Sequence, residues 1–74
     1  MILVNCALRQ DDIIKIVEGI EVDGNKPFTF KSKQGLQIFF NSTYGDDAKA
    51  ASLIKSQIKA TEVGKALFFS VAAK

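Results

Sequence analysis

The sequence predicts an α+β domain with the element order strand, helix, strand, strand, helix, strand. Three observations predict this class. Apolar residues alternate with polar ones in the segments around Phe28 and Ile38, they recur at helical spacing in two other segments, and a nearly continuous apolar run opens the chain. The 74 residues include no linker rich in proline, glycine or serine, so we expect residues 1–74 to form a single domain around one core.

The first strand is expected at residues 2–8, which are nearly all apolar. Such a run is typical of a central strand rather than an edge strand. Residues 11–20 follow as a helix, because isoleucine and valine recur there at helical spacing. Asp11 and Asp12 precede this pattern and suit the cap of a helix start.

Residues 27–33 and 36–41 are expected to pair as a β-hairpin across a short turn at Gly35. In the first of these segments Phe28 and Phe30 alternate with polar residues, which is the period of a half-buried strand. The same segment begins with a proline and carries two lysines. Both features favour a strand at the edge of the sheet.

The second helix is expected at residues 47–60, and Gly64 is expected near its C-terminal stop. Its apolar stripe would consist of Ala50 or Ala51, Ile54 and Ile58. Residues 66–73 are apolar with an alternating pattern and are expected to form the last strand.

This element order predicts a ferredoxin-like βαββαβ arrangement, in which two helices cover one face of a four-stranded antiparallel sheet. Its usual strand order, 4-1-3-2, places the first and third strands at the centre. That order agrees with the very apolar first segment and leaves Pro27 on an edge strand.

The amino-acid composition indicates which partners and which cellular location to expect. Ten lysine and arginine residues against eight aspartate and glutamate residues give a formal charge of +2, too small to predict binding to nucleic acid or an anionic membrane. No apolar stretch approaches the roughly 20 residues that a membrane-spanning helix requires. A single cysteine cannot form an internal disulfide, so we expect a cytoplasmic protein that does not contact a membrane.

The residues that could carry chemistry are few. The chain has no histidine, which excludes histidine-dependent nucleophilic catalysis and the common histidine metal sites for this chain alone. Cys6 lies on the helix-facing side of the first predicted strand, so we interpret it as a core residue rather than a reactive thiol. Asp11-Asp12 and Asp46-Asp47 open the two predicted helices, and we favour capping over binding of Mg²⁺ or Ca²⁺. We therefore expect no enzymatic activity, metal or cofactor.

The predicted strand faces define a candidate binding surface. The face that meets the helices would carry Phe28, Phe30, Leu36, Ile38, Phe40, Leu67, Phe69 and Val71. The opposite face would carry Leu3, Asn5, Ala7, Thr29, Gln37, Phe39, Phe68 and Ser70. Leu3, Phe39 and Phe68 would form a patch on three adjacent strands that solvated monomers rarely leave bare. The candidate binding residues are Leu3, Asn5, Gln37, Phe39 and Phe68.

We favour a second copy of the chain as the partner of this face, because association would enlarge a small core that has no disulfide or metal. RNA-recognition motifs have a similar element order and bind RNA on the same face. Nucleic acid is nevertheless disfavoured, because residues 33–40 carry leucine and isoleucine where aromatic residues should face RNA. A regulatory module for an unknown small molecule remains open. So does the possibility that the two phenylalanines are scattered surface residues or that the strand faces are assigned in reverse.

Overall fold

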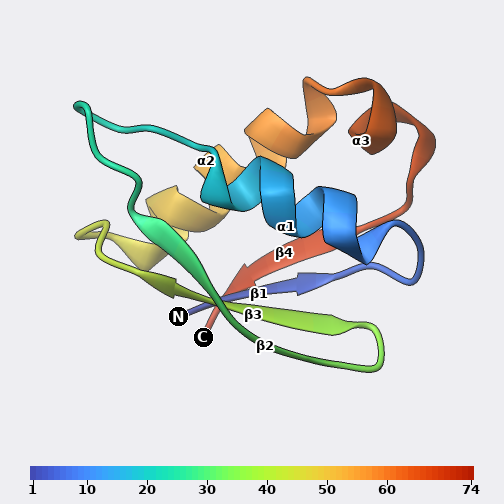
Figure 1. Ribbon diagram of the computed structural model, residues 1–74. Coiled ribbons are helices and arrows are strands. Elements are labelled where there is room, and N and C mark those ends of the chain that lie inside the picture. The colour runs from blue at the N-terminus through green and yellow to red at the C-terminus, as the bar shows by residue number, and fades with distance from the viewer.

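The computed structural model describes residues 1–74, which form four strands and three helices (Figure 1). The elements are β1 (Ile2–Asn5), α1 (Gln10–Glu18), β2 (Phe28–Gln34), β3 (Gln37–Ser42), α2 (Asp47–Lys59), α3 (Glu62–Ala66) and β4 (Ser70–Ala73). The strands form one antiparallel sheet in the order β2-β3-β1-β4, so β1 and β3 are central. The predicted α+β class with a four-stranded antiparallel sheet is therefore confirmed.

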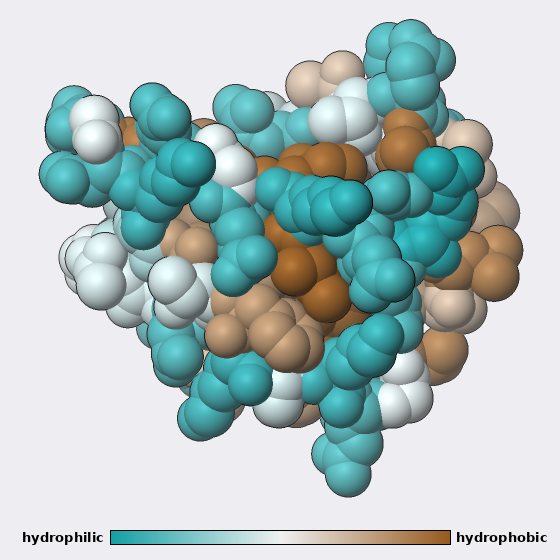
Figure 2. Space-filling model, viewed as in Figure 1, coloured by the Kyte–Doolittle hydropathy of each residue, from teal (hydrophilic) through white to brown (hydrophobic).

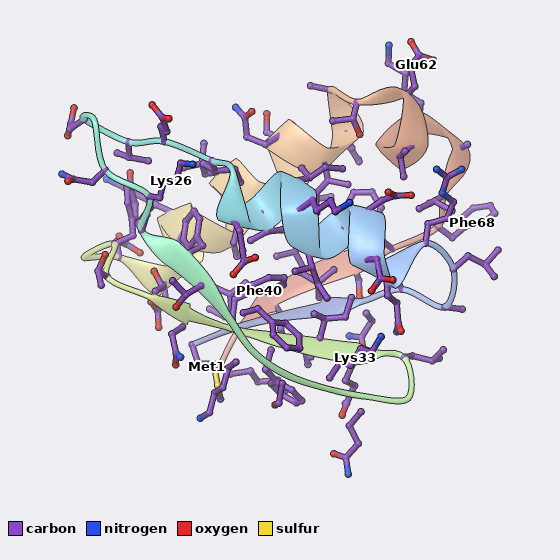
Figure 3. The ribbon with its side chains drawn as sticks, viewed as in Figure 1. Met1, Lys26, Lys33, Phe40, Glu62 and Phe68 are labelled. Atoms are coloured by element: carbon purple, nitrogen blue, oxygen red, sulfur yellow. The ribbon has the colours of Figure 1, made fainter.

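The helices lie on one face of the sheet, with α1 packed against β2 and α2 packed against β4 (Figure 1). The core lies between these two layers, where Figure 3 places Phe40. It includes Ile2, Val4, Ile38 and Phe40 from the central strands and Ile13, Val17, Ala50, Ile54 and Ile58 from the helices. These nine side chains are 0% exposed, so the apolar residues that recur at helical and strand spacing in the sequence are buried in one core. None of the helices is both long enough and apolar enough to span a membrane.

The two long helices begin in different ways. The side chain of Asp46 accepts a hydrogen bond of 3.1 Å from the backbone N–H of Lys49, so Asp46 caps α2 as predicted. The cap position of α1 is instead Arg9, which has a left-handed backbone with φ 58° and makes no side-chain capping bond. Asp11 and Asp12 lie in the first turn of α1, where they complement the helix dipole but do not cap it.

The helix α3 is absent from the sequence prediction, which placed Gly64 at the stop of a single long helix. Gly64 instead lies inside α3 and is buried against the end of α2. Its N–H donates a 3.0 Å hydrogen bond to Oγ1 of Thr61, which caps α3. The chain therefore turns sharply after α2, and α3 occupies part of the segment that was predicted to lead directly into the last strand.

Several strand boundaries differ from the prediction. The first strand was expected to reach Leu8, but β1 ends at Asn5 and Leu8 is 66% exposed. The side-chain amide of Gln10 donates to the carbonyl oxygens of Cys6 and Gly35, at 2.9 and 2.7 Å, and holds the chain where it leaves the sheet. Leu36 lies in the β2–β3 turn and is 58% exposed, rather than facing the helices. The last strand begins at Ser70, four residues later than expected from residues 66–73.

Candidate functional site

The sheet face that no helix covers is organised in rows of residues paired across neighbouring strands. The central row, from β2 to β4, is Ser32, Phe39, Leu3 and Ala72. The next row is Gln34, Gln37, Asn5 and Ser70, and a further pair on the other side of the central row is Thr29 and Asn41. We call these ten residues the open face. Apart from Ser32, its central row is apolar, and its other rows are polar.

The structure brings four of the five candidate residues together on the open face. Leu3 lies opposite Phe39, and Asn5 lies opposite Gln37. Leu3 is 4% exposed, whereas Phe39 remains partly exposed. The Nδ2 atom of Asn5 donates to Oγ of Ser70 at 3.3 Å, which ties the polar row of β1 to that of β4.

The fifth candidate residue, Phe68, does not join the open face. It precedes β4, and its side chain is 99% exposed and points away from the molecule close to α3 (Figure 3). The β1–β4 ladder ends at the pair of Asn5 and Ser70, so the alternation that assigned Phe68 to this face does not extend to it. Ala7, which was also expected on this face, lies beyond the end of β1.

The open face carries no acidic side chain. The eight carboxylates belong to helices and loops: Asp11, Asp12, Glu18, Glu21, Asp23, Asp46, Asp47 and Glu62. Two lysines flank the face. Lys31 lies at the register shift of β2, with its Nζ 3.7 Å from Sδ of Met1, and Lys74 follows β4. The face is therefore rich in amides and bordered by positive charge.

A second surface feature lies where β1 and β4 separate. Residues Cys6, Ala7, Leu8, Ala66, Leu67 and Phe68 line a hollow of about 210 Å³, which we call the apolar hollow. Every lining residue is hydrophobic, and Leu8 and Phe68 are the two most exposed large hydrophobic residues of the chain. Apolar surface is visible on the right of Figure 2, at the end of the molecule where Figure 3 places Phe68.

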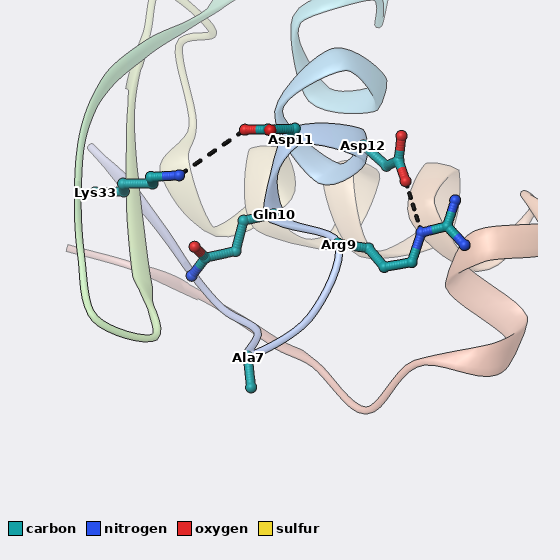
Figure 4. A pocket seen from close by; sticks show the side chains of 6 residues that line it. All are labelled: Ala7, Arg9, Gln10, Asp11, Asp12 and Lys33. Atoms are coloured by element: carbon teal, nitrogen blue, oxygen red, sulfur yellow. Dashed lines mark hydrogen bonds and ion pairs between the residues drawn. The ribbon is translucent and has the colours of Figure 1, made fainter.

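A charged recess of about 430 Å³ lies on the other side of the loop that follows β1 (Figure 4). It is lined by Ala7, Arg9, Gln10, Asp11, Asp12 and Lys33. Nε of Arg9 lies 2.7 Å from Oδ2 of Asp12, and Nζ of Lys33 lies 3.8 Å from Oδ1 of Asp11. These charges neutralise one another at the surface, where such pairs contribute little stability. The lining offers no hydroxyl, thiol or imidazole, and its carboxylates, Asp11 and Asp12, are paired with Lys33 and Arg9.

The other groups that could react or bind a metal ion are the thiol of Cys6 and the carboxylates. Cys6 is a free thiol, 3% exposed and packed in the core, as predicted, with its Sγ 3.1 Å from the carbonyl oxygen of Leu8. No three cysteine, aspartate or glutamate side chains gather where they could bind one metal ion.

The apolar hollow is the feature that sequence reasoning missed. Leu8 was assigned to the first strand, and Phe68 was assigned to the sheet face opposite the helices. The signal was present in the run from Ala66 to Phe69, which has more bulky apolar residues than a strand with one buried face requires. The sequence pattern alone does not indicate where the β1–β4 ladder ends.

A scan of protein-family models and searches of curated proteins and of solved structures find no match to this chain.

Proposed function

We propose that this chain is a non-catalytic interaction domain that self-associates by packing the open face of one copy against that of another. The observation that carries this proposal is the central row of the open face. Phe39 is partly exposed there, beside Leu3 and Ala72, on the side of the sheet that the helices leave bare. An apolar centre inside a rim of uncharged polar residues is the usual composition of a protein interface.

A two-fold axis through the middle of the sheet would bring the two copies of Phe39 close together. Sheets that pack face to face lie about 10 Å apart with their strands rotated by about 30°. In that arrangement the amides of Asn5, Gln34 and Gln37 surround the aromatic pair and can hydrogen-bond across the interface. The lysines stay at the margin, so no charge is buried.

The area of the sheet predicts that this contact is weak. Four strands about 4.8 Å apart, each with about five residues at about 3.3 Å, present a plane of roughly 300 Å² per copy. Stable interfaces bury about 800 Å² per partner. Because Leu3 is already only 4% exposed in the single chain, Phe39 supplies most of the apolar surface that association would bury. We therefore expect a dissociation constant in the micromolar range or weaker, and a dimer that persists at high salt.

The test is the solution mass of a Phe39→Asp variant beside a Ser52→Asp control. Both substitutions change the net charge equally, but Ser52 is exposed on α2, on the other side of the molecule. The proposal expects Phe39→Asp to raise the dissociation constant at least tenfold and Ser52→Asp to leave it unchanged. Thermal melting by circular dichroism establishes that both variants fold. A folded Phe39→Asp variant with wild-type association contradicts the proposal.

We further assign the fold to the ferredoxin-like βαββαβ arrangement. The antiparallel strand order, read from β4 to β2, and the position of α1 and α2 on one face support this assignment. The short helix α3 is an addition to that arrangement. We also propose a cytoplasmic location, because the one cysteine is buried and the fold uses no disulfide.

Single-stranded nucleic acid is a second candidate partner, favoured by the absence of acidic residues on the open face. Phe39 could stack on a base, the neighbouring amides could contact base edges, and Lys31 and Lys74 could contact phosphates. With two lysines, the logarithm of the binding constant should fall with the logarithm of salt concentration with a slope of about −1.4. Fluorescence anisotropy with a labelled single-stranded oligonucleotide tests this, and no binding at low salt rejects it.

A further inference from the structure

We propose that the chain has a second self-complementary surface, in which Phe68 of one copy inserts into the apolar hollow of another copy. This surface is separate from the open face, and Phe68 is the most exposed large hydrophobic side chain of the molecule.

The hollow exists because two chain segments leave the sheet at the same place. The last β1–β4 pair joins Asn5 to Ser70. Beyond this pair, residues 6–8 turn toward α1 and residues 66–68 come from α3, with no backbone hydrogen bond between the two segments. Leu67 packs partly against the core, so Phe68, the next residue, projects outward. The hollow is therefore walled by apolar side chains, and no helix or strand of the chain covers it.

The size and chemistry of the hollow fit one aromatic ring. A cavity of about 150 Å³ lined by aliphatic and aromatic side chains accommodates benzene. The apolar hollow, at about 210 Å³ and open on one side, accepts a phenyl ring with some space to spare. Phe68 does not fill this space in its own chain, because its side chain is 99% exposed.

A second copy is the occupant that this geometry favours, because the inserting group and its receptor lie next to one another on one surface. A two-fold axis beside Phe68 would place each ring in the opposite hollow, so both insertions occur together. The two rings would then lie beside one another in the offset arrangement that aromatic pairs prefer. No lining residue is charged, so an identical partner brings no like charge into the contact.

The area that this contact would bury determines how strongly two copies should associate through it. Two phenylalanine side chains remove roughly 300–500 Å² from water, well below the roughly 1,200 Å² of a stable interface. The contact alone should therefore be detectable only at high concentration. Because the open face lies elsewhere on the molecule, two different two-fold contacts would join copies into chains longer than a dimer.

Sedimentation velocity over a concentration series, from about 10 µM to about 1 mM, tests this inference separately from the proposed function. The variants are Phe39→Asp, Phe68→Asp and their combination, with Phe39→Asp combined with Ser52→Asp as the charge-matched control. Leu8→Asp places a charge in the hollow from its other wall and should act like Phe68→Asp. Both Leu8 and Phe68 are exposed, so these changes should leave the melting temperature of the monomer unchanged.

The inference expects Phe39→Asp to dimerise weakly at the highest concentrations, and the addition of Phe68→Asp, but not of Ser52→Asp, to leave a monomer. Association that keeps its wild-type strength in Phe39→Asp and is abolished by Phe68→Asp alone supports the hollow and contradicts the open face. A wild-type dimer that becomes fully monomeric through Phe39→Asp alone overturns the hollow and leaves the proposed function intact. A wild-type protein that stays monomeric throughout overturns both.

Discussion

Replacing Gly64 with alanine should destabilise the domain by about 3 kcal/mol, through a steric conflict at the junction of α2 and α3. A Cβ atom at this position would lie 1.7 Å from the carbonyl oxygen of Ile58 and 2.5 Å from its carbonyl carbon. Ordinary van der Waals contact begins at 3.4 Å, so the two backbone segments would have to separate by about 1.7 Å. Both contacts are backbone atoms, so no side-chain rotation relieves them.

The magnitude follows from what such a separation would break. The carbonyl oxygen of Ile58 accepts hydrogen bonds from Thr61 Oγ1 and the Thr61 N–H, at 2.7 and 3.1 Å, and the side chain of Ile58 is 0% exposed in the core. Overpacking costs about 1–3 kcal/mol, and loss of a helix cap costs about 1 kcal/mol more. For a domain of this size, about 3 kcal/mol lowers the melting temperature by roughly 12–24 °C.

The matched control is Gly45→Ala, because no heavy atom lies within 4 Å of a Cβ built at Gly45. That change should alter stability by less than about 1 kcal/mol. Urea denaturation and thermal melting, both followed by circular dichroism, measure the two variants. If Gly64→Ala melts within a few degrees of the wild type and of the control, α3 does not pack on the end of α2 as described. The hollow would then lose the support that positions Ala66 and Phe68.

Three further predictions concern the core, a helix cap and a strained residue. The thiol of Cys6, 3% exposed, should react with an alkylating reagent far more slowly in the native protein than in urea, and equal rates would contradict its burial. Asp46→Ala should lower the free energy of unfolding by about 1 kcal/mol, whereas Asp46→Asn, which retains an acceptor, should cost less. An equal loss for both would mean that the cap is unimportant. Arg9→Gly should stabilise the domain by up to about 1 kcal/mol, because it relieves a left-handed backbone with φ 58° and gives up only an exposed ion pair with Asp12. A clear loss of stability in urea would show that this ion pair matters more than the backbone strain.

The sequence was sufficient to predict the core because regular periods determine which side chains are buried. Ile54 and Ile58 recur at helical spacing, and Ile38 and Phe40 recur at strand spacing, and all four are 0% exposed. Short elements carry no such period. The five residues of α3 begin at a Thr61 cap and include a glycine, a pattern that a helix stop produces as well.

The open face was predicted more completely than the surroundings of Phe68 for a related reason. Leu3 and Phe39 lie on central strands that have partners on both sides, so pairing fixes which face they take. Phe68 precedes an edge strand, and the position where pairing begins depends on α3. Tertiary packing of α3 on α2 thus decides whether this phenylalanine belongs to the sheet or to the hollow, and the alternating pattern of residues 66–73 does not encode that choice.

Self-association can be measured by light scattering after size exclusion, on the wild-type protein over a range of concentrations at low and high salt. We expect a mass near 8.1 kDa at low concentration that rises toward two or more chains as concentration increases, with little effect of salt. A mass of 8.1 kDa at every concentration would contradict self-association and would leave a different molecule as the partner of the open face.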